Sequence, residues 1–198
     1  NKTSSIKTVN PTTNEVEKVF DVMTEHQIEE IVSAADKAFH SWRKTSFEER
    51  AKLLHKVASI LRERKEELGK LCTIEMGKLH KEAIGEVDLC ADIFDYYANN
   101  GAKFLADAPL ETPHGKAFLS YEPIGVLLSV QPWNFPFYQI TRSAAANIMA
   151  GNTFLLKHAS NVPQCAAVME KIFTEAGAPK GVYTNLFVPG SKISNLVA

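Results

Sequence analysis

Three short apolar stretches alternate with two segments of helical spacing in the second half of the chain, and this alternation constrains the fold more than any other feature. The expected strands are residues 125–130, 153–157 and 183–188, and the expected helices are residues 137–149 and 163–176. Continuously apolar strands that alternate with helices predict an α/β fold with a parallel sheet covered on both faces. In an open sheet of this kind, ligands bind at the carboxyl ends of the strands.

Two polar features stand at such strand ends. The turn at residues 132–136, Pro-Trp-Asn-Phe-Pro, follows the first expected strand, and Lys157 ends the second. A charge at the end of an apolar strand must reach solvent, a partner or a ligand. The pattern therefore indicates a cofactor and substrate crevice, although the residues alone are also compatible with Asn134 closing a turn and Lys157 being solvated.

The amino-terminal segment is expected to form a strand pair and a helix. Residues 6–21 mix β-forming residues around an Asn-Pro turn signal. Thr24 and Gln27 form a capping box, which starts a helix that should reach about Arg43. Its apolar residues recur at intervals of three and four and are expected to form one buried stripe: Ile28, Ile31, Val32, Ala35, Ala38, Phe39 and Trp42.

Two longer helices are expected next. Ser46 and Glu49 form a second capping box, and the helix that follows should end near Gly77, where a glycine past the last turn is favoured. A third helical segment covers about residues 80–105, and Gly101 could interrupt it.

A change of composition separates the helical part from the sheet. Residues 107–115 contain Pro109, Pro113 and Gly115 and are expected to be a turn-rich break. Residues 117–123 are expected to be an edge strand, because Pro123 cannot donate to a ladder. The chain is therefore divided into three expected parts, at residues 1–106, 107–123 and 124–198.

Composition and charge exclude several classes of protein. The net charge of −1 creates no field that attracts nucleic acid or an anionic membrane, and no apolar run approaches the roughly 18 residues of a membrane span. The first residues lack the apolar core of a signal peptide. The three cysteines match no metal or disulfide framework, so we interpret them as small buried hydrophobic residues. A soluble, reduced, cytoplasmic protein without a bound metal is expected.

Several motifs in register resemble the aldehyde dehydrogenase superfamily. They are Trp-Asn-Phe-Pro at 133–136, Ala-Gly-Asn-Thr at 150–153, Leu-Lys-His-Ala-Ser at 156–160 and Pro-Lys-Gly-Val-Tyr-Thr-Asn-Leu at 179–186. The segment Lys-His-Ala-Ser-Asn-Val-Pro at residues 157–163 is most similar to the branch of succinate-semialdehyde dehydrogenases. The resemblance implies a truncated aldehyde dehydrogenase fold, with residues 1–106 and a Rossmann-like core at 124–198 forming an incomplete NAD(P)-binding domain. Residues 107–123 would belong to a projecting β-hairpin that joins subunits of a homo-dimer or homo-tetramer.

The resemblance also implies roles for individual residues. Asn134 would donate to the oxyanion that forms when a thiolate adds to an aldehyde, and Arg142 would bind the far carboxylate of succinate semialdehyde. Lys157 would bond the hydroxyls of the adenosine ribose. Ser160 stands where many NAD-preferring relatives carry glutamate, which makes NADP admissible beside NAD. The remaining residues expected at the cofactor are Val130, Pro132, Trp133 and His158, although a packing role is the commoner one for a lone histidine.

The activity implied is the NAD(P)-dependent oxidation of an aldehyde to its acid through a cysteine thiohemiacetal. Succinate semialdehyde is the first choice of substrate, and a neutral aliphatic or aromatic aldehyde is the alternative. None of the three cysteines lies in the family's catalytic motif, so the nucleophile and the general-base glutamate are expected outside these residues. A non-catalytic nucleotide-binding or scaffold fragment is therefore the alternative from another class.

Overall fold

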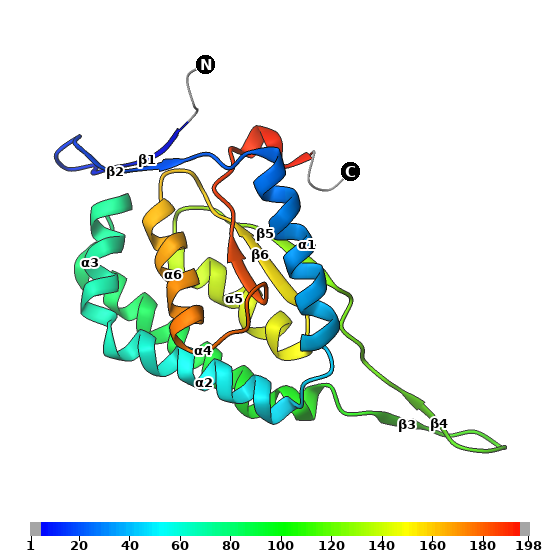
Figure 1. The fold of residues 1–198 in the computed structure, drawn as a ribbon. Coiled ribbons are helices and arrows are strands. Elements are labelled where there is room, and N and C mark those ends of the chain that lie inside the picture. The colour runs from blue at the N-terminus through cyan, green and yellow to red at the C-terminus, as the bar shows by residue number, and fades with distance from the viewer. Residues whose placement is uncertain (1–4, 195–198) are drawn as a thin grey trace.

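The computed structural model describes residues 5–194, drawn in Figure 1. Its elements, in chain order, are β1 (Ser5–Val9), β2 (Val16–Asp21), α1 (Glu25–Trp42), α2 (Phe47–Glu63), α3 (Lys65–Met76), α4 (His80–Phe104), β3 (Ala108–Leu110), β4 (Ala117–Leu119), β5 (Val126–Val130), α5 (Pro136–Ala150), β6 (Thr153–Lys157), α6 (Pro163–Glu175), β7 (Tyr183–Asn185) and the 3-10 helix η1 (Gly190–Lys192). The first and last few residues, on which part of the signal-peptide expectation and the end of segment 124–198 fall, lie outside the described residues.

A three-stranded parallel sheet, in the order β5-β6-β7, forms the centre of the fold. Helix α1 covers one face and helices α5 and α6 cover the other, as Figure 1 shows. Successive residues of β6 separate the two cores: Phe154 and Leu156 join the large core, while Leu155 packs with Ile28 and Ala35 of α1. The prediction of a parallel sheet covered on both faces is confirmed.

The last expected strand is shorter than predicted. β7 ends at Asn185 instead of reaching residue 188. Leu186 still donates its N–H to the Leu156 carbonyl at 2.7 Å, and both Leu186 and Val188 are buried against α1. Burial of alternate residues therefore continues after the ladder ends, which explains why the apolar pattern extends further than the strand.

The predicted start of helix α1 is confirmed, but not every residue of its predicted apolar stripe is buried. Gln27 donates its N–H to Thr24 Oγ1 at 3.2 Å, and the reciprocal bond completes the capping box. Val32 is 38% exposed, because it lies at the margin of the stripe, away from the line of residues that meets the sheet. The antiparallel pair β1–β2 is also confirmed, with Ser5 opposite Asp21.

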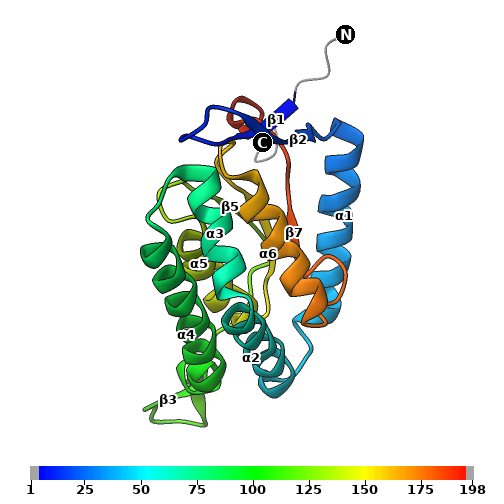
Figure 2. The ribbon, with the colours of Figure 1, turned by 90° about the vertical axis from the view of Figure 1, so that its left-hand side faces the viewer.

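The single helix expected from residue 46 to Gly77 is two helices. Arg64 leaves the helical region, with φ −108° and ψ 12°, and α3 begins one residue later. Its guanidinium bonds Glu67 at 2.8 Å and Glu175 at 3.1 Å, which ties the break to α6. The break lets α3 turn to pack against α6 (Figure 2), and Gly77 ends α3 in the left-handed conformation, as predicted.

Helix α4 runs without interruption through Gly101, so the expected point of interruption is wrong. Gly101 is buried, and a Cβ atom there would lie 2.4 Å from Met149 Cγ. The absence of a side chain therefore serves the close approach of α4 to α5.

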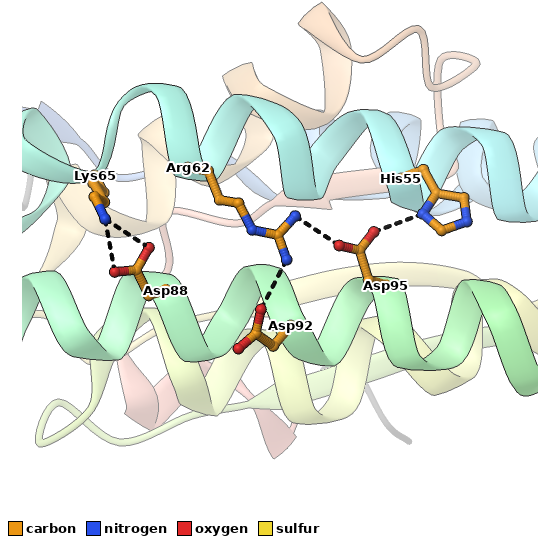
Figure 3. A network of polar contacts seen from close by, with 6 residues as sticks. All are labelled: His55, Arg62, Lys65, Asp88, Asp92 and Asp95. Carbon is orange, nitrogen blue, oxygen red and sulfur yellow. Dashed lines mark hydrogen bonds and ion pairs between the residues drawn. The ribbon is translucent and has the colours of Figure 1, made fainter.

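Helix α4 is joined along the surface to α2 and to the first residue of α3 by a row of ion pairs and hydrogen bonds, shown in Figure 3. Arg62 contacts Asp92 at 2.8 Å and Asp95 at 2.6 Å, and His55 contacts Asp95 at 2.6 Å. The row is completed by Lys65 and Asp88, whose closest nitrogen and oxygen are 2.9 Å apart. Exposed pairs of this kind each contribute little to stability, so the buried core holds these helices together.

The segment between α4 and the sheet forms a projecting hairpin (Figure 1). The expected turn-rich break at 107–115 contains β3, which pairs antiparallel with β4, and the edge strand expected at 117–123 ends at Leu119. Strand β3 was not predicted because it contains Pro109. A proline argues against a strand unless the strand lies at an edge, as β3 does.

Helices of residues 5–194 include none that is long and apolar enough to cross a membrane. The same residues bring together no group of three His, Cys, Asp or Glu side chains suited to a metal ion.

The large core runs continuously from α2 to α6, through Leu54, Phe94 and Phe173. The division at 106 and 123 stays a prediction.

Candidate active site

The fold brings the two polar strand ends together. Val130, the last residue of β5, lies opposite Lys157, the last residue of β6. Gln131 then donates its N–H to the Lys157 carbonyl at 3.1 Å, which continues the ladder into the turn. The Pro-Trp-Asn-Phe-Pro turn and the strand-end lysine therefore lie side by side at the carboxyl edge of the sheet.

The first residues of the turn present their side chains to solvent. Pro132 and Asn134 are exposed, Trp133 is 51% exposed, and Val130 before them is 54% exposed. Within residues 5–194, the Asn134 side chain has no hydrogen-bonding partner. Its amide is therefore available as a donor to a bound molecule.

Lys157 is buried, with 7% of its surface exposed. Its ammonium has no ion pair or hydrogen bond in the described part of the chain, and burial lowers its pKa. A Cβ built on Gly190 would lie 3.8 Å from Nζ, so η1 passes beside the ammonium. A buried cation without a counterion is costly, so Lys157 stays a candidate for contact with a bound molecule.

His158 is buried directly behind the turn. Its Nε2 lies 2.9 Å from the Pro136 carbonyl, and its Nδ1 lies 2.9 Å from the Ala159 N–H. The two contacts are satisfied together by a neutral ring that donates from Nε2 and accepts at Nδ1. Burial lowers the pKa of His158, in agreement with a neutral ring. The ring therefore holds the turn to β6, and Ser160, two residues on, is exposed in the loop before α6.

We expect the free energy of unfolding to fall as the pH drops below about 6.5, the ordinary pKa of histidine. The folded state takes up a proton at His158 less readily than the unfolded state does, so stability is complete above this pH and is lost as the pH falls toward the lowered pKa. Denaturant unfolding between pH 7 and 5 measures the effect. The His158→Gln variant, which keeps a donor for the Pro136 carbonyl, should show a weaker pH dependence; an identical dependence contradicts this assignment.

Arg142 lies on the exposed side of α5, one turn after Tyr138. Its guanidinium carbon is 6.0 Å from the centre of the Tyr138 ring. Among the described residues no carboxylate pairs with Arg142, so its charge is free to bind an anion.

Two buried glutamates that the sequence analysis missed hold the helices behind the site. Glu86 of α4 accepts the N–H groups of Phe137 at 2.8 Å and Tyr138 at 3.0 Å. Glu75 of α3 accepts the N–H groups of Gln164 and Cys165, both at 2.8 Å, and also bonds Thr8.

Each glutamate caps the N-terminus of a helix that has no side-chain cap from its own preceding residue. The residues before α5 and α6, Phe135 and Val162, make no side-chain cap, and a proline follows each. A carboxylate at this place satisfies free N–H groups and complements the helix dipole. In the sequence, the only sign of this arrangement was that neither helix has a capping residue before it. The caps therefore had to come from distant residues.

The three cysteines are buried and unpaired, as interpreted from the sequence. Burial raises the pKa of Cys72 to about 12, and burial also raises the pKa of Cys90 and of Cys165 above the ordinary thiol value. Since the thiolate is the reactive form, none of the three is suited to act as a nucleophile.

Comparison with known proteins agrees with the fold and the site motifs. The family model described as "Aldehyde dehydrogenase family" matches residues 1–198. The chain therefore belongs to the aldehyde dehydrogenase family, which bears out the resemblance of the motifs.

Individual relatives cover nearly the whole chain. It is 43% identical over 191 residues to a succinate-semialdehyde dehydrogenase [NADP(+)] of Deinococcus radiodurans, an alignment of 96% of this chain and 40% of the relative. It is 42% identical over 194 residues to a probable enzyme of the same name from Synechocystis, covering 98% of this chain and 43% of the relative.

A solved structure is equally similar. The succinic semialdehyde dehydrogenase of Streptococcus pyogenes, in complex with NADP+, superposes with a TM-score of 0.94 at 45% identity, over 98% of this chain and 43% of that one. The chain thus spans about two fifths of the length of the relatives it matches.

Proposed function

We propose that the protein containing this chain oxidises an aldehyde to its carboxylic acid with NADP or NAD, and that its substrate is succinate semialdehyde. One observation carries the proposal: the exposed amide of Asn134 and the buried, unpaired ammonium of Lys157 lie at adjacent strand ends of one parallel sheet. Cofactor and substrate crevices of α/β proteins lie at this edge.

The residues present fit a nicotinamide dinucleotide. Lys157 offers an ammonium without a partner, which suits ribose hydroxyls and phosphate. Ser160 is neutral and exposed. Its side chain would not repel a 2′-phosphate, and its hydroxyl could donate a hydrogen bond to it. The dinucleotide would also contact Val130, Pro132 and Trp133. His158 would act indirectly, by holding the turn in place. The names of the relatives, which specify NADP(+), favour NADP.

In the reaction, Asn134 stabilises negative charge on the aldehyde oxygen. A cysteine thiolate outside these residues adds to the carbonyl carbon and forms a thiohemiacetal, and the Asn134 N–H donates to the oxygen that receives the electron pair. A bound dinucleotide would supply the hydride acceptor for that carbon. A glutamate, also outside these residues, then activates the water that releases the acid.

Arg142 supports an aldehyde substrate that carries a carboxylate at its far end. Its guanidinium is exposed and has no partner carboxylate in the described part of the chain. Arginine binds carboxylates through two parallel hydrogen bonds. The relatives named for succinate semialdehyde support the same substrate, and a neutral aldehyde is the alternative if Arg142 does not contact it.

We expect Lys157→Met in the whole enzyme to weaken NADP+ binding about tenfold, since a hydrogen bond from a charged group contributes roughly 1.5–3 kcal/mol. Fluorescence titration with NADP+ measures the dissociation constant. Lys180→Met is the matched control, because Lys180 is exposed and precedes β7 at the opposite end of the sheet. Equal affinity of the Lys157→Met variant and the wild type would argue against the cofactor site.

The alternative from another class is a nucleotide-binding scaffold without turnover. It is favoured by one observation, that the three cysteines are buried with raised pKa values. Cofactor binding by the whole protein without reduction by any aldehyde would support this alternative.

We also propose that the β3–β4 hairpin joins subunits of a homo-oligomer in the cytoplasm. Leu110, Phe118 and Leu119 are about half exposed on it. Apolar groups along an unpaired strand edge favour pairing with another chain.

A further inference from the structure

We infer that Lys78 and Glu86 are positioning residues for Asn134, and this inference rests on the proposed function. Asn134 makes no hydrogen bond of its own within residues 5–194, so its orientation depends on the backbone of the turn that carries it. An oxyanion donor acts only if it is held in place before the reaction. The groups that fix this turn therefore bear on the rate.

Glu86 fixes the end of the turn at α5. The residue reaches across from α4, 51 positions away, and its side chain is almost fully buried. Oε1 accepts the N–H groups of Phe137 and Tyr138, which are the second and third residues of the helix. The first helical residue, Pro136, has no N–H to offer.

Lys78 fixes the residue next to Asn134. Its ammonium pairs with Glu86 Oε2 and also lies 3.7 Å from the centre of the Phe135 ring. One lysine thus joins the helix cap to the aromatic ring that directly follows Asn134, and a cation over an aromatic face is an attractive contact. Lys78 lies in the loop between α3 and α4, directly after Gly77, which ends α3 in the left-handed conformation.

The turn is therefore held from three directions. Glu86 binds the two N–H groups after it, Lys78 covers the Phe135 ring, and His158 bonds the Pro136 carbonyl. The Lys78 and Glu86 side chains are 11% and 2% exposed, and their contacts are with the turn and the start of α5, so they would act by setting where Asn134 stands.

The test compares Lys78→Met with Lys65→Met in the whole enzyme. Lys65 is the matched control, because it also pairs with an aspartate of α4, Asp88, but far from the turn (Figure 3). Lys78→Met should lower kcat per titrated active site about tenfold, since small misplacement of a catalytic group costs up to about 10² in rate. The KM for NADP+ should stay unchanged, and Lys78→Arg should restore turnover.

A merely structural role gives a different result. Lower stability reduces the number of active sites and leaves turnover per site unchanged, and this outcome overturns the inference. Glu86→Gln, which keeps an acceptor but loses the ion pair, provides a second variant if Lys78→Met does not fold; wild-type turnover in it overturns the inference as well.

Hydrogen exchange separates this inference from the proposed function. Amide protection of Phe137 and Tyr138 should fall in Glu86→Ala and Lys78→Met but not in Lys65→Met, even in a protein that oxidises no aldehyde. Loss of protection without any wild-type turnover refutes the proposed function alone. Unchanged protection refutes the positioning role.

Discussion

Replacing Asn134 by alanine in the whole enzyme should lower kcat about 10²–10³-fold, the usual cost of losing one oxyanion donor. The side chain is exposed and has no partner among residues 5–194, so its removal leaves no unsatisfied group in the fold. Stability and NADP+ affinity should therefore stay close to those of the wild type. Single-turnover measurement of NADPH formation separates the chemical step from product release.

Asn100→Ala is the control for this prediction. Asn100 is also an asparagine near the surface, but it only donates to the Tyr96 carbonyl within α4. Its replacement should leave kcat unchanged. A fall in kcat of less than about threefold in Asn134→Ala would remove Asn134 from the reaction, because a lost transition-state hydrogen bond costs more than that.

Arg142→Ala should reduce kcat/KM for succinate semialdehyde about 10²-fold and leave kcat/KM for a neutral aliphatic aldehyde of the same length unchanged. Removal of one partner from a hydrogen-bonded charge pair costs roughly 2–5 kcal/mol, and the effect is smaller where solvent screens the pair. Arg142 has no carboxylate partner within the described residues, so no internal ion pair is lost.

The neutral aldehyde serves as the internal control, and Arg142→Lys tests geometry. Lysine keeps the charge but cannot form the two parallel bonds of a guanidinium, so this variant should recover part of the lost kcat/KM. Equal losses for the charged and the neutral aldehyde would show that Arg142 does not recognise the carboxylate of succinate semialdehyde, and would favour the neutral-aldehyde alternative.

Local sequence patterns predicted most of the fold. The capping box at Thr24, the glycine end of α3 and the β5-β6-β7 alternation all depend on residues a few positions apart. The meeting of the turn with Lys157 was also predictable, because the carboxyl ends of parallel strands share one edge of the sheet.

The features that escaped prediction depend on long-range contacts. The break at Arg64 is tied to Glu175, 111 residues away, and Gly101 is set by its contact with Met149. Glu75 and Glu86 cap helices 89 and 51 positions further along the chain. No periodicity records such pairs, so only the structure reveals how the turn that carries Asn134 is held.

The most direct test of the proposed activity is the reduction of NADP+ by the whole protein with succinate semialdehyde, before and after alkylation of its thiols. We expect turnover with formation of succinate, abolished by alkylation and protected by substrate. The buried Cys72, Cys90 and Cys165 should remain unmodified in the folded protein. Tight binding of NADP+ without reduction by succinate semialdehyde or by a neutral aldehyde would show that the protein is not an aldehyde dehydrogenase in activity.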